Sequence, residues 1–280
     1  MRNQATDLYW KKIFGVEWFK IDYKIKQFLF QKFGFTFPKL ISQHSYWKNR
    51  GRVYMSEIMN SGYLEREVFF QNMIINYLKT IQFDSIFEAG CGFGWNIRRF
   101  KKEFPEKSVG GVDFSISQLS NARGYLSGMP IQVVNGDNCR LPYKDNSFDV
   151  GFSLGVFMNI HSSKIKSALS ELVRVSRKYI IHLEYDQNHT TPLLLEKRAF
   201  KTNIISHDYK QLYEEMGGKV EVFRTYKDFG QAYLNHQKKI FSNLDRWEGF
   251  EGAEKYIFIV VKVPPSSQRV WEKEISNEEK

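Results

Sequence analysis

Three glycines at alternate positions follow an apolar run that ends in an acid, within IFEAGCGFGWNI at residues 86–97. The acid and the glycines are Glu88, Gly90, Gly92 and Gly94. Glycine loses more backbone freedom on folding than any other residue, so this density indicates a turn under tight steric demands. The dinucleotide-binding motif G-x-G-x-x-G would need a glycine at position 95, where Trp95 stands. The phosphate-binding loop G-x-x-x-x-G-K-[ST] would need a lysine that this stretch lacks. An acid here would repel a pyrophosphate but suits a ligand that carries a cationic ammonium group.

Two further acids close predicted strands. Asp113 ends the strand at 108–113, and Asp137 ends the strand at 131–137. The carboxyl ends of parallel strands form the edge where α/β sheets bind nucleotides. A carboxylate at Asp113 can accept hydrogen bonds from two ribose hydroxyls, although a strand-ending acid taken alone is more often a helix cap.

This series of motifs resembles the class I S-adenosylmethionine (SAM) dependent methyltransferases, whose first motif is E/D-x-G-x-G-x-G. The resemblance covers about residues 46–262 and includes GVDFS at 111–115 and LPYKDNSFDV at 141–150. It implies SAM as cofactor, S-adenosylhomocysteine (SAH) as product, and a glycine backbone that approaches the methionine part of SAM. It further implies that Asp113 binds the ribose and Asp137 the adenine amino group. The implied cofactor contacts are Glu88, Gly90, Cys91, Gly92, Gly94, Asp113, Phe114, Ser115, Gln118, Asp137, Asn138, Cys139, Ser153 and Val156, with Tyr46 and Arg50 as lid residues beside Trp47.

Candidate residues for chemistry on the acceptor follow the later strands. His161 comes after the fourth strand, where similar enzymes often place a base; the alternative is a solvated loop histidine. Glu184, at the end of the fifth strand, is a second candidate base. Phe157, Tyr185 and His207 are predicted substrate contacts. No cluster has metal-ligand spacing, which disfavours a metal-dependent reaction.

Strands alternating with helices must position these groups. The predicted strands are 84–88, 108–113, 131–137, 147–154, 178–185, 219–226 and 256–263, with helices at 68–80, 94–103, after Ser115, at 163–175 and at 207–216. This alternation predicts a Rossmann-like α/β sheet of mostly parallel strands with helices on both faces. The family resemblance implies seven strands in the order 3-2-1-4-5-7-6. Asp149, inside the fourth strand, is interpreted as structural because a buried acid needs partners.

The composition along the chain also predicts where its domains begin and end. We expect a basic aromatic extension at 1–45, a methyltransferase domain at 46–263 with a helical insertion at about 227–254, and a disordered tail at 264–280. Two cysteines and no long apolar run favour a cytoplasmic protein. The net charge is +10, and residues 1–40 carry eight Lys or Arg against three Asp or Glu. This segment either packs on the main domain or binds peripherally to an anionic membrane surface.

The acceptor is less defined than the cofactor. Residues 157–186 resemble methyltransferases of glycan and sugar biosynthesis, so we expect a small-molecule or glycan acceptor, with a sugar hydroxyl as the first choice. An RNA methyltransferase is an alternative, using the basic N-terminus to hold phosphates. Nucleic acid is disfavoured because no N-P-P-Y motif or Pro-Cys pair is present. A SAM-binding protein without catalysis is the third hypothesis. Oligomeric state does not follow from the sequence.

Overall fold

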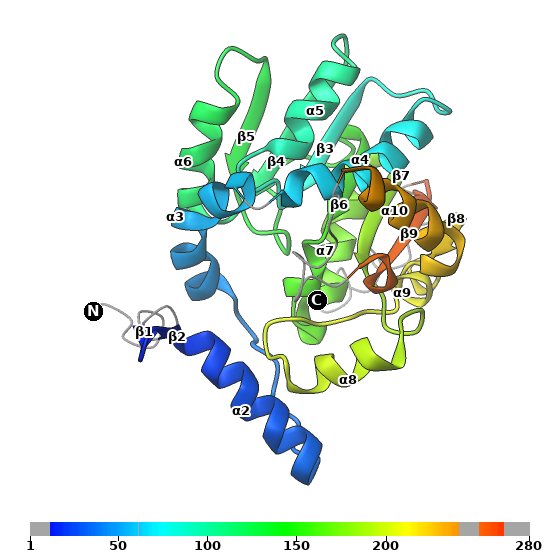
Figure 1. The fold of residues 1–280 in the computed structure, drawn as a ribbon. Coiled ribbons are helices and arrows are strands. Elements are labelled where there is room, and N and C mark those ends of the chain that lie inside the picture. Colours follow the sequence, from blue (N-terminus) through cyan, green and yellow to red (C-terminus); the bar gives the residue numbers. More distant parts are fainter. Residues whose placement is uncertain (1–11, 61, 241–251, 266–280) are drawn as a thin grey trace, which may run out of the picture.

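A seven-stranded sheet forms the centre of the computed structural model, which describes residues 12–60, 62–240 and 252–265 (Figure 1). The strands are β3 (Ser85–Ala89), β4 (Ser108–Asp113), β5 (Ile131–Asn135), β6 (Phe148–Leu154), β7 (Ser176–Tyr185), β8 (Lys219–Thr225) and β9 (Tyr256–Lys262). Their order across the sheet is β5-β4-β3-β6-β7-β9-β8. In chain order this is 3-2-1-4-5-7-6, so the predicted fold is confirmed.

Strand direction follows the chain connections. The first five strands are parallel, and β9 runs antiparallel to both β7 and β8. Every residue of β3 is buried, as are six of the seven in β9, because helices cover both faces of the sheet. Parallel central strands therefore bring their carboxyl ends to one edge.

Helices divide between the two faces according to the alternation of strand side chains. Ile86 packs into one core with α4 (Tyr63–Leu78), α5 (Trp95–Glu103), α6 (Ile116–Tyr125) and α10 (Tyr226–Ile240). Phe87, the next residue, packs into the other core with α7 (Ser162–Val175) and α9 (Tyr209–Glu215). Helix α10 lies within the predicted insertion, and residues 241–251 of that interval lie outside the described residues. Most of the predicted tail also lies outside them.

Asp149 on β6 joins two parts of the sheet at its amino edge. Its Oδ2 accepts a hydrogen bond from the Asp84 N–H at 2.6 Å, and its Oδ1 pairs with the Arg177 guanidinium at 2.9 Å. Burial alone would raise the pKa of this carboxyl, but these donors outweigh it and lower the pKa below its usual range. The predicted structural role of Asp149 is confirmed.

The N-terminal elements lie beside the sheet rather than within it. A short hairpin, β1 (Lys12–Ile13) and β2 (Val16–Glu17), leads into α2 (Trp18–Phe33), and α3 (His44–Asn60) follows. The predicted boundary after residue 45 falls within α3. Helix α2 extends away from the sheet alongside α8 (Pro192–Phe200), which the sequence did not predict (Figure 1). Among the described helices, none has the length and apolar character needed to span a bilayer.

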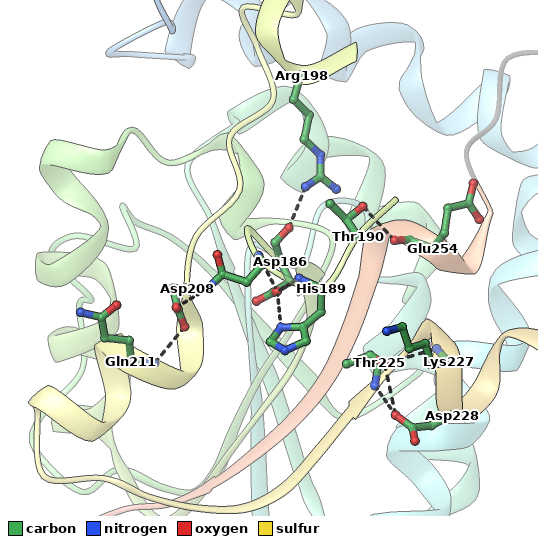
Figure 2. Close-up of polar contacts among 11 residues, drawn as sticks. Asp186, His189, Thr190, Arg198, Asp208, Gln211, Thr225, Lys227, Asp228 and Glu254 are labelled. Carbon is green, nitrogen blue, oxygen red and sulfur yellow. Dashed lines mark hydrogen bonds and ion pairs between the residues drawn. The ribbon is translucent and has the colours of Figure 1, made fainter. Parts of the chain in front are cut away.

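Helix α8 is tied to the end of β7 through Asp186 (Figure 2). The Asp186 side chain accepts hydrogen bonds from the N–H groups of Asn188 and His189 at 2.9 and 2.6 Å, which folds the chain back after the strand. Arg198, on α8, donates to the Asp186 carbonyl at 2.7 Å. The position of α8 is therefore fixed relative to the central sheet.

Candidate functional site

A pocket opens at the carboxyl ends of β3, β4 and β6, beneath the start of α3. The sequence-predicted residues that line it are Glu88, Gly90, Cys91, Gly92, Asp113, Phe114, Gln118, Asp137, Asn138, Cys139, Val156 and His161. They come from four segments, each at the carboxyl end of a parallel strand. The topology of the sheet brings them to one edge, as the motif order indicated.

Glu88 places a carboxylate in the pocket wall with one oxygen unused. Its Oε1 accepts a hydrogen bond from Asn96 at 2.6 Å, and Gln71 in turn donates to Asn96 at 2.8 Å. Its Oε2 is buried and has no hydrogen-bond partner within the described chain. Burial raises the pKa of Glu88 to about 8. A cationic group beside Oε2 would satisfy that oxygen and favour the ionised form.

The glycine turn is required by the packing of the protein itself as well as by access to the pocket. Gly90 has φ of +79°, and a Cβ added there would lie 2.3 Å from Cγ1 of Val156. Gly92 has φ of +54°, but an added Cβ would meet only Gln118, at 3.5 Å. At Gly90, therefore, the protein neighbour Val156 also excludes a side chain, in addition to the predicted approach of the cofactor to the backbone.

Asp113 is oriented by the backbone of the neighbouring turns. Its Oδ2 accepts from the Gly92 N–H at 2.9 Å and its Oδ1 from the Ser115 N–H at 2.8 Å. A carboxylate has about four acceptor sites, so two remain for a ligand. Nearby, the buried Oε1 of Gln118 has no partner within the described part of the chain. These acceptors suit a ligand that presents hydroxyl donors.

Helix α3 covers the pocket and is held on α6. The Ser115 hydroxyl donates to the Trp47 carbonyl at 3.3 Å, and a Cβ added at Gly51 would lie 2.5 Å from the Ser117 hydroxyl. At the start of α3, His44 lies with its ring 4.4 Å from that of Phe114. The Nε2 of His44 is 3.7 Å from Asp137 Oδ2 on the opposite rim.

Part of this chain is similar in sequence to known proteins. A sequence model of the methyltransferase domain family matches residues 86–179. Residues 86–179 are therefore similar to a methyltransferase domain. The cofactor of that family is SAM. Over 130 residues, or 44% of its length, the chain is 31% identical to a demethylmenaquinone methyltransferase of Staphylococcus aureus, of which the match covers 52%. The chain thus spans about half the length of the curated relatives it matches.

Solved structures show the same fold. One is a chain of the complex between the Haloferax volcanii Trm112 methyltransferase activator and a methyltransferase, with a TM-score of 0.56 and 15% identity. That match covers 77% of this chain and 97% of the other. Another is a geranyl diphosphate C-methyltransferase of Streptomyces coelicolor, solved with Mg²⁺, geranyl diphosphate and SAH. Its TM-score is 0.51, with 12% identity, 65% of this chain covered and 71% of the other.

Glu184 lies behind the pocket rather than in it, which does not fit its predicted role as a base. Its carboxylate is fully buried and accepts hydrogen bonds from the Ser153 hydroxyl at 2.6 Å and the Val156 N–H at 2.9 Å. The Met158 N–H approaches its other oxygen at 3.4 Å. Burial raises the pKa of Glu184 to about 7. Its position indicates that it holds the turn after β6, including Val156 in the pocket wall.

Several other predicted contacts also lie outside the pocket lining. They are Gly94, Ser115, Ser153, Phe157, Tyr185 and His207 of the cofactor and substrate sets, and Tyr46 and Arg50 of the lid set. His207 is buried and its Nε2 is 3.0 Å from the Ile160 carbonyl, and burial lowers its pKa to about 4. Arg50 forms an ion pair with Glu57. Strand order alone could not show that these residues lie outside the lining.

His161 lines the pocket and also caps α7. Its Nδ1 accepts a hydrogen bond from the Ser163 N–H at 3.2 Å. In a neutral imidazole only one nitrogen carries a proton, so this bond places the proton on Nε2. His161 therefore offers the pocket a donor in this arrangement, whereas the sequence predicted a base.

Some lining residues were not found from the sequence. They are Ile41, Ser42, Gln43, His44, Tyr54, Trp95, Asn96, Asn159 and Lys164. The sequence did contain a local signal for Asn96, because this residue lies in the first turn of the helix that follows the glycine turn. Tyr54 had none, because its place in the pocket depends on how α3 crosses α6. Within the described residues, no group of three His, Cys, Asp or Glu could hold a metal ion.

Proposed function

We propose that this protein transfers a methyl group from SAM to a small-molecule acceptor. The observation that carries the proposal is the pair Glu88 and Asp113, which line one pocket and keep acceptor capacity free. SAM, when bound, supplies a methyl group on a sulfonium, and the carbon–sulfur bonding pair returns to sulfur as the new bond forms. Such a displacement depends largely on alignment of the reactants.

Each end of the pocket fits one part of that cofactor. Glu88 Oε2 is assigned to the ammonium group, and Asp113 to the ribose hydroxyls. Asp137 is assigned to the adenine amino group; its Oδ1 already accepts from the Cys139 N–H at 2.8 Å, so Oδ2 would serve. Asn138 and Cys139 would flank the base. The remaining contacts assigned to the cofactor are Gly90, Cys91, Gly92, Phe114, Gln118 and Val156.

The acceptor we propose is a small molecule whose nucleophile needs no strong base. His161 presents a donor, and Glu184 lies behind the wall, so neither predicted base is placed to remove a proton. A hydroxyl of a sugar usually needs such a base. Electron-rich rings and deprotonated amines do not. The relatives named for demethylmenaquinone and geranyl diphosphate support an amphiphilic acceptor with an apolar chain.

A lipid-linked glycan combines the sequence-predicted sugar with such an apolar chain, so it belongs in the same acceptor screen. An acceptor of this kind would bring the protein to the cytoplasmic face of a membrane. The basic N-terminal segment supports this location.

Calorimetric titration with SAM and SAH tests the cofactor proposal. We expect micromolar binding of both to wild type, much weaker binding to Glu88→Gln, and unchanged binding to Glu106→Gln, an exposed acid on the same protein. SAH release is then measured with quinols, prenyl diphosphates, lipid-linked sugars and amines. Failure to bind either ligand would refute the cofactor site. Binding without SAH release from any acceptor class would instead favour the non-catalytic hypothesis.

A further inference from the structure

Helix α2 has two apolar faces, and the described residues cover only one of them. Tyr23 and Phe30, two turns apart, contact the ring of Phe200 on α8 at 5.3 and 5.7 Å. At 3.6 residues per turn, Ile25 and Phe28 fall on the opposite side. Their exposed fractions are 47% and 59%. A helix that packs by one stripe needs no second apolar stripe for its own folding.

The exposed side of α2 forms a continuous apolar surface. We call it the outer stripe, and it consists of Val16, Ile21, Ile25, Phe28 and Leu29, which line a shallow hollow together with Lys24. Phe14 is fully exposed in the hairpin before the helix, and Phe33 and Phe35 are exposed at its end. Exposed apolar surface of this extent marks an interaction site.

Basic residues accompany the outer stripe. Residues 18–33 contain four lysines and one acid. That acid, Asp22, is already paired with Lys26 at 2.6 Å. Lys24 and Lys32 are exposed beside the stripe. Aromatic and aliphatic side chains flanked by lysines match the layer where acyl chains meet anionic headgroups.

We propose that the outer stripe docks this protein on an anionic phospholipid bilayer. Phe28 and Ile25 enter the acyl boundary, and Lys24 and Lys32 remain at the level of the headgroups. Because the helix is too polar to cross a bilayer, it lies in the plane of the surface.

The segment between α2 and α3 links this surface to the pocket. It runs along α8 and the residues after it, with the Leu40 N–H donating to the Thr202 carbonyl at 3.0 Å and Gln43 to the Asn203 carbonyl at 2.9 Å. Ile41, between them, is 64% exposed and lines the pocket. This short connection joins the docked helix to the pocket mouth, where an amphiphilic acceptor of the proposed reaction would enter; this last step rests on the proposed function.

Vesicle co-sedimentation of the full-length protein tests the docking. We compare phosphatidylcholine vesicles with vesicles that contain phosphatidylglycerol, using wild type, the double variant Ile25→Glu with Phe28→Glu, and Leu234→Glu. Leu234 is 44% exposed on α10 and is the matched control. We expect wild type and Leu234→Glu to bind anionic vesicles in a salt-sensitive manner, and the double variant to lose at least about tenfold in binding.

Several outcomes would overturn the docking proposal. One is failure of wild type to bind anionic vesicles, and another is equal binding by the double variant. A third is a wild-type dimer in light scattering that the double variant abolishes while no protein binds vesicles, because the stripe would then contact a second copy. SAH titration separates the two proposals: the double variant should bind SAH as wild type does. Vesicle binding by a wild type that binds no SAH would leave the docking intact and refute the cofactor site.

Discussion

We expect the affinity of this protein for SAM and SAH to rise as the pH is raised from 6 to 8. The reason lies in Glu88, whose pKa is raised to about 8 by burial in the unliganded protein. An ammonium group can pair with Glu88 only in its ionised form. Below pH 8, ligand binding must therefore release a proton from this carboxyl, and the free energy of that release subtracts from the binding free energy.

The magnitude follows from the titration of a single group. Each pH unit below the pKa costs about 1.4 kcal/mol, or about tenfold in affinity. Because the group is about half ionised at pH 8, the loss between pH 8 and pH 6 is roughly 50-fold. Glu88→Gln cannot ionise, so its affinity should be weak at pH 8 and nearly independent of pH across this range.

The same pKa shift has a consequence for stability. An unfolded Glu ionises near its usual pKa of 4.5, whereas the folded Glu88 ionises near 8. The folded state thus binds the extra proton between these values, and stability falls as pH rises through this window. Glu88→Gln removes this loss, so the variant should be more stable than wild type at pH 8, by at most roughly 5 kcal/mol.

Calorimetry between pH 6 and pH 8 in buffers of different ionisation enthalpy measures affinity and proton release together. Thermal unfolding at pH 5 and pH 8 measures the stability difference. Glu106→Gln serves as control for both. A wild-type affinity that does not change with pH, with no proton released on binding, would refute the assignment of Glu88 to the ammonium group.

Substitutions at Asp113, Gly90 and His161 test the site further. Asp113→Ala should weaken SAH binding by roughly 1.5–3 kcal/mol, the scale of hydrogen bonds to a charged group, and unchanged affinity in calorimetry would remove the ribose assignment. Gly90→Ala combines a positive φ with a contact to Val156 and should destabilise the fold by roughly 2–5 kcal/mol. Gly128→Ala, at φ of +78° with open space around it, isolates the backbone strain, so equal losses in denaturant titration would contradict the packing argument. His161→Ala and His161→Asn should both lower turnover at unchanged SAH affinity, but only the alanine should destabilise α7, by about 1 kcal/mol, because asparagine can still cap the helix. Full turnover in the asparagine variant would exclude an acceptor contact.

The sheet and the glycine turn could be predicted because their signals are local. Short apolar runs that alternate with helical spacing define strands such as 108–113, and the positions of Glu88 and Asp113 follow directly from where those strands end. The lid was predicted only in part: Trp47, a predicted lid residue, lines the pocket, but Tyr54 faces it only through the close crossing of α3 over α6 at Gly51. That crossing depends on a contact about 65 residues away in sequence.

Glu184 could not be placed for a different reason. Alternation normally tells which way a strand residue points, because one face is buried and the other is solvated. The last six residues of β7 are all buried, so the pattern carries no such direction. The partners of Glu184 are backbone N–H groups of the turn after β6, which no side-chain pattern reports. An acid at the end of a central strand is therefore compatible with both catalysis and support.

The hydrogen-bond network around Glu184 favours support over catalysis. Ser153 donates to Glu184, so its oxygen must accept from His182 Nδ1 at 2.7 Å. His182 is then protonated on Nδ1, and its Nε2 accepts from the Tyr213 hydroxyl at 2.5 Å. Burial lowers the pKa of His182 to about 3, which keeps it neutral and preserves this single direction of donation. The hydrogen bonds of this network all run toward Glu184, and together with the Val156 N–H they compensate the burial of its carboxylate. Glu88, in contrast, keeps a buried oxygen that has no donor among the described residues. The acid behind the wall is thus satisfied by the protein, whereas the acid in the pocket wall keeps acceptor capacity.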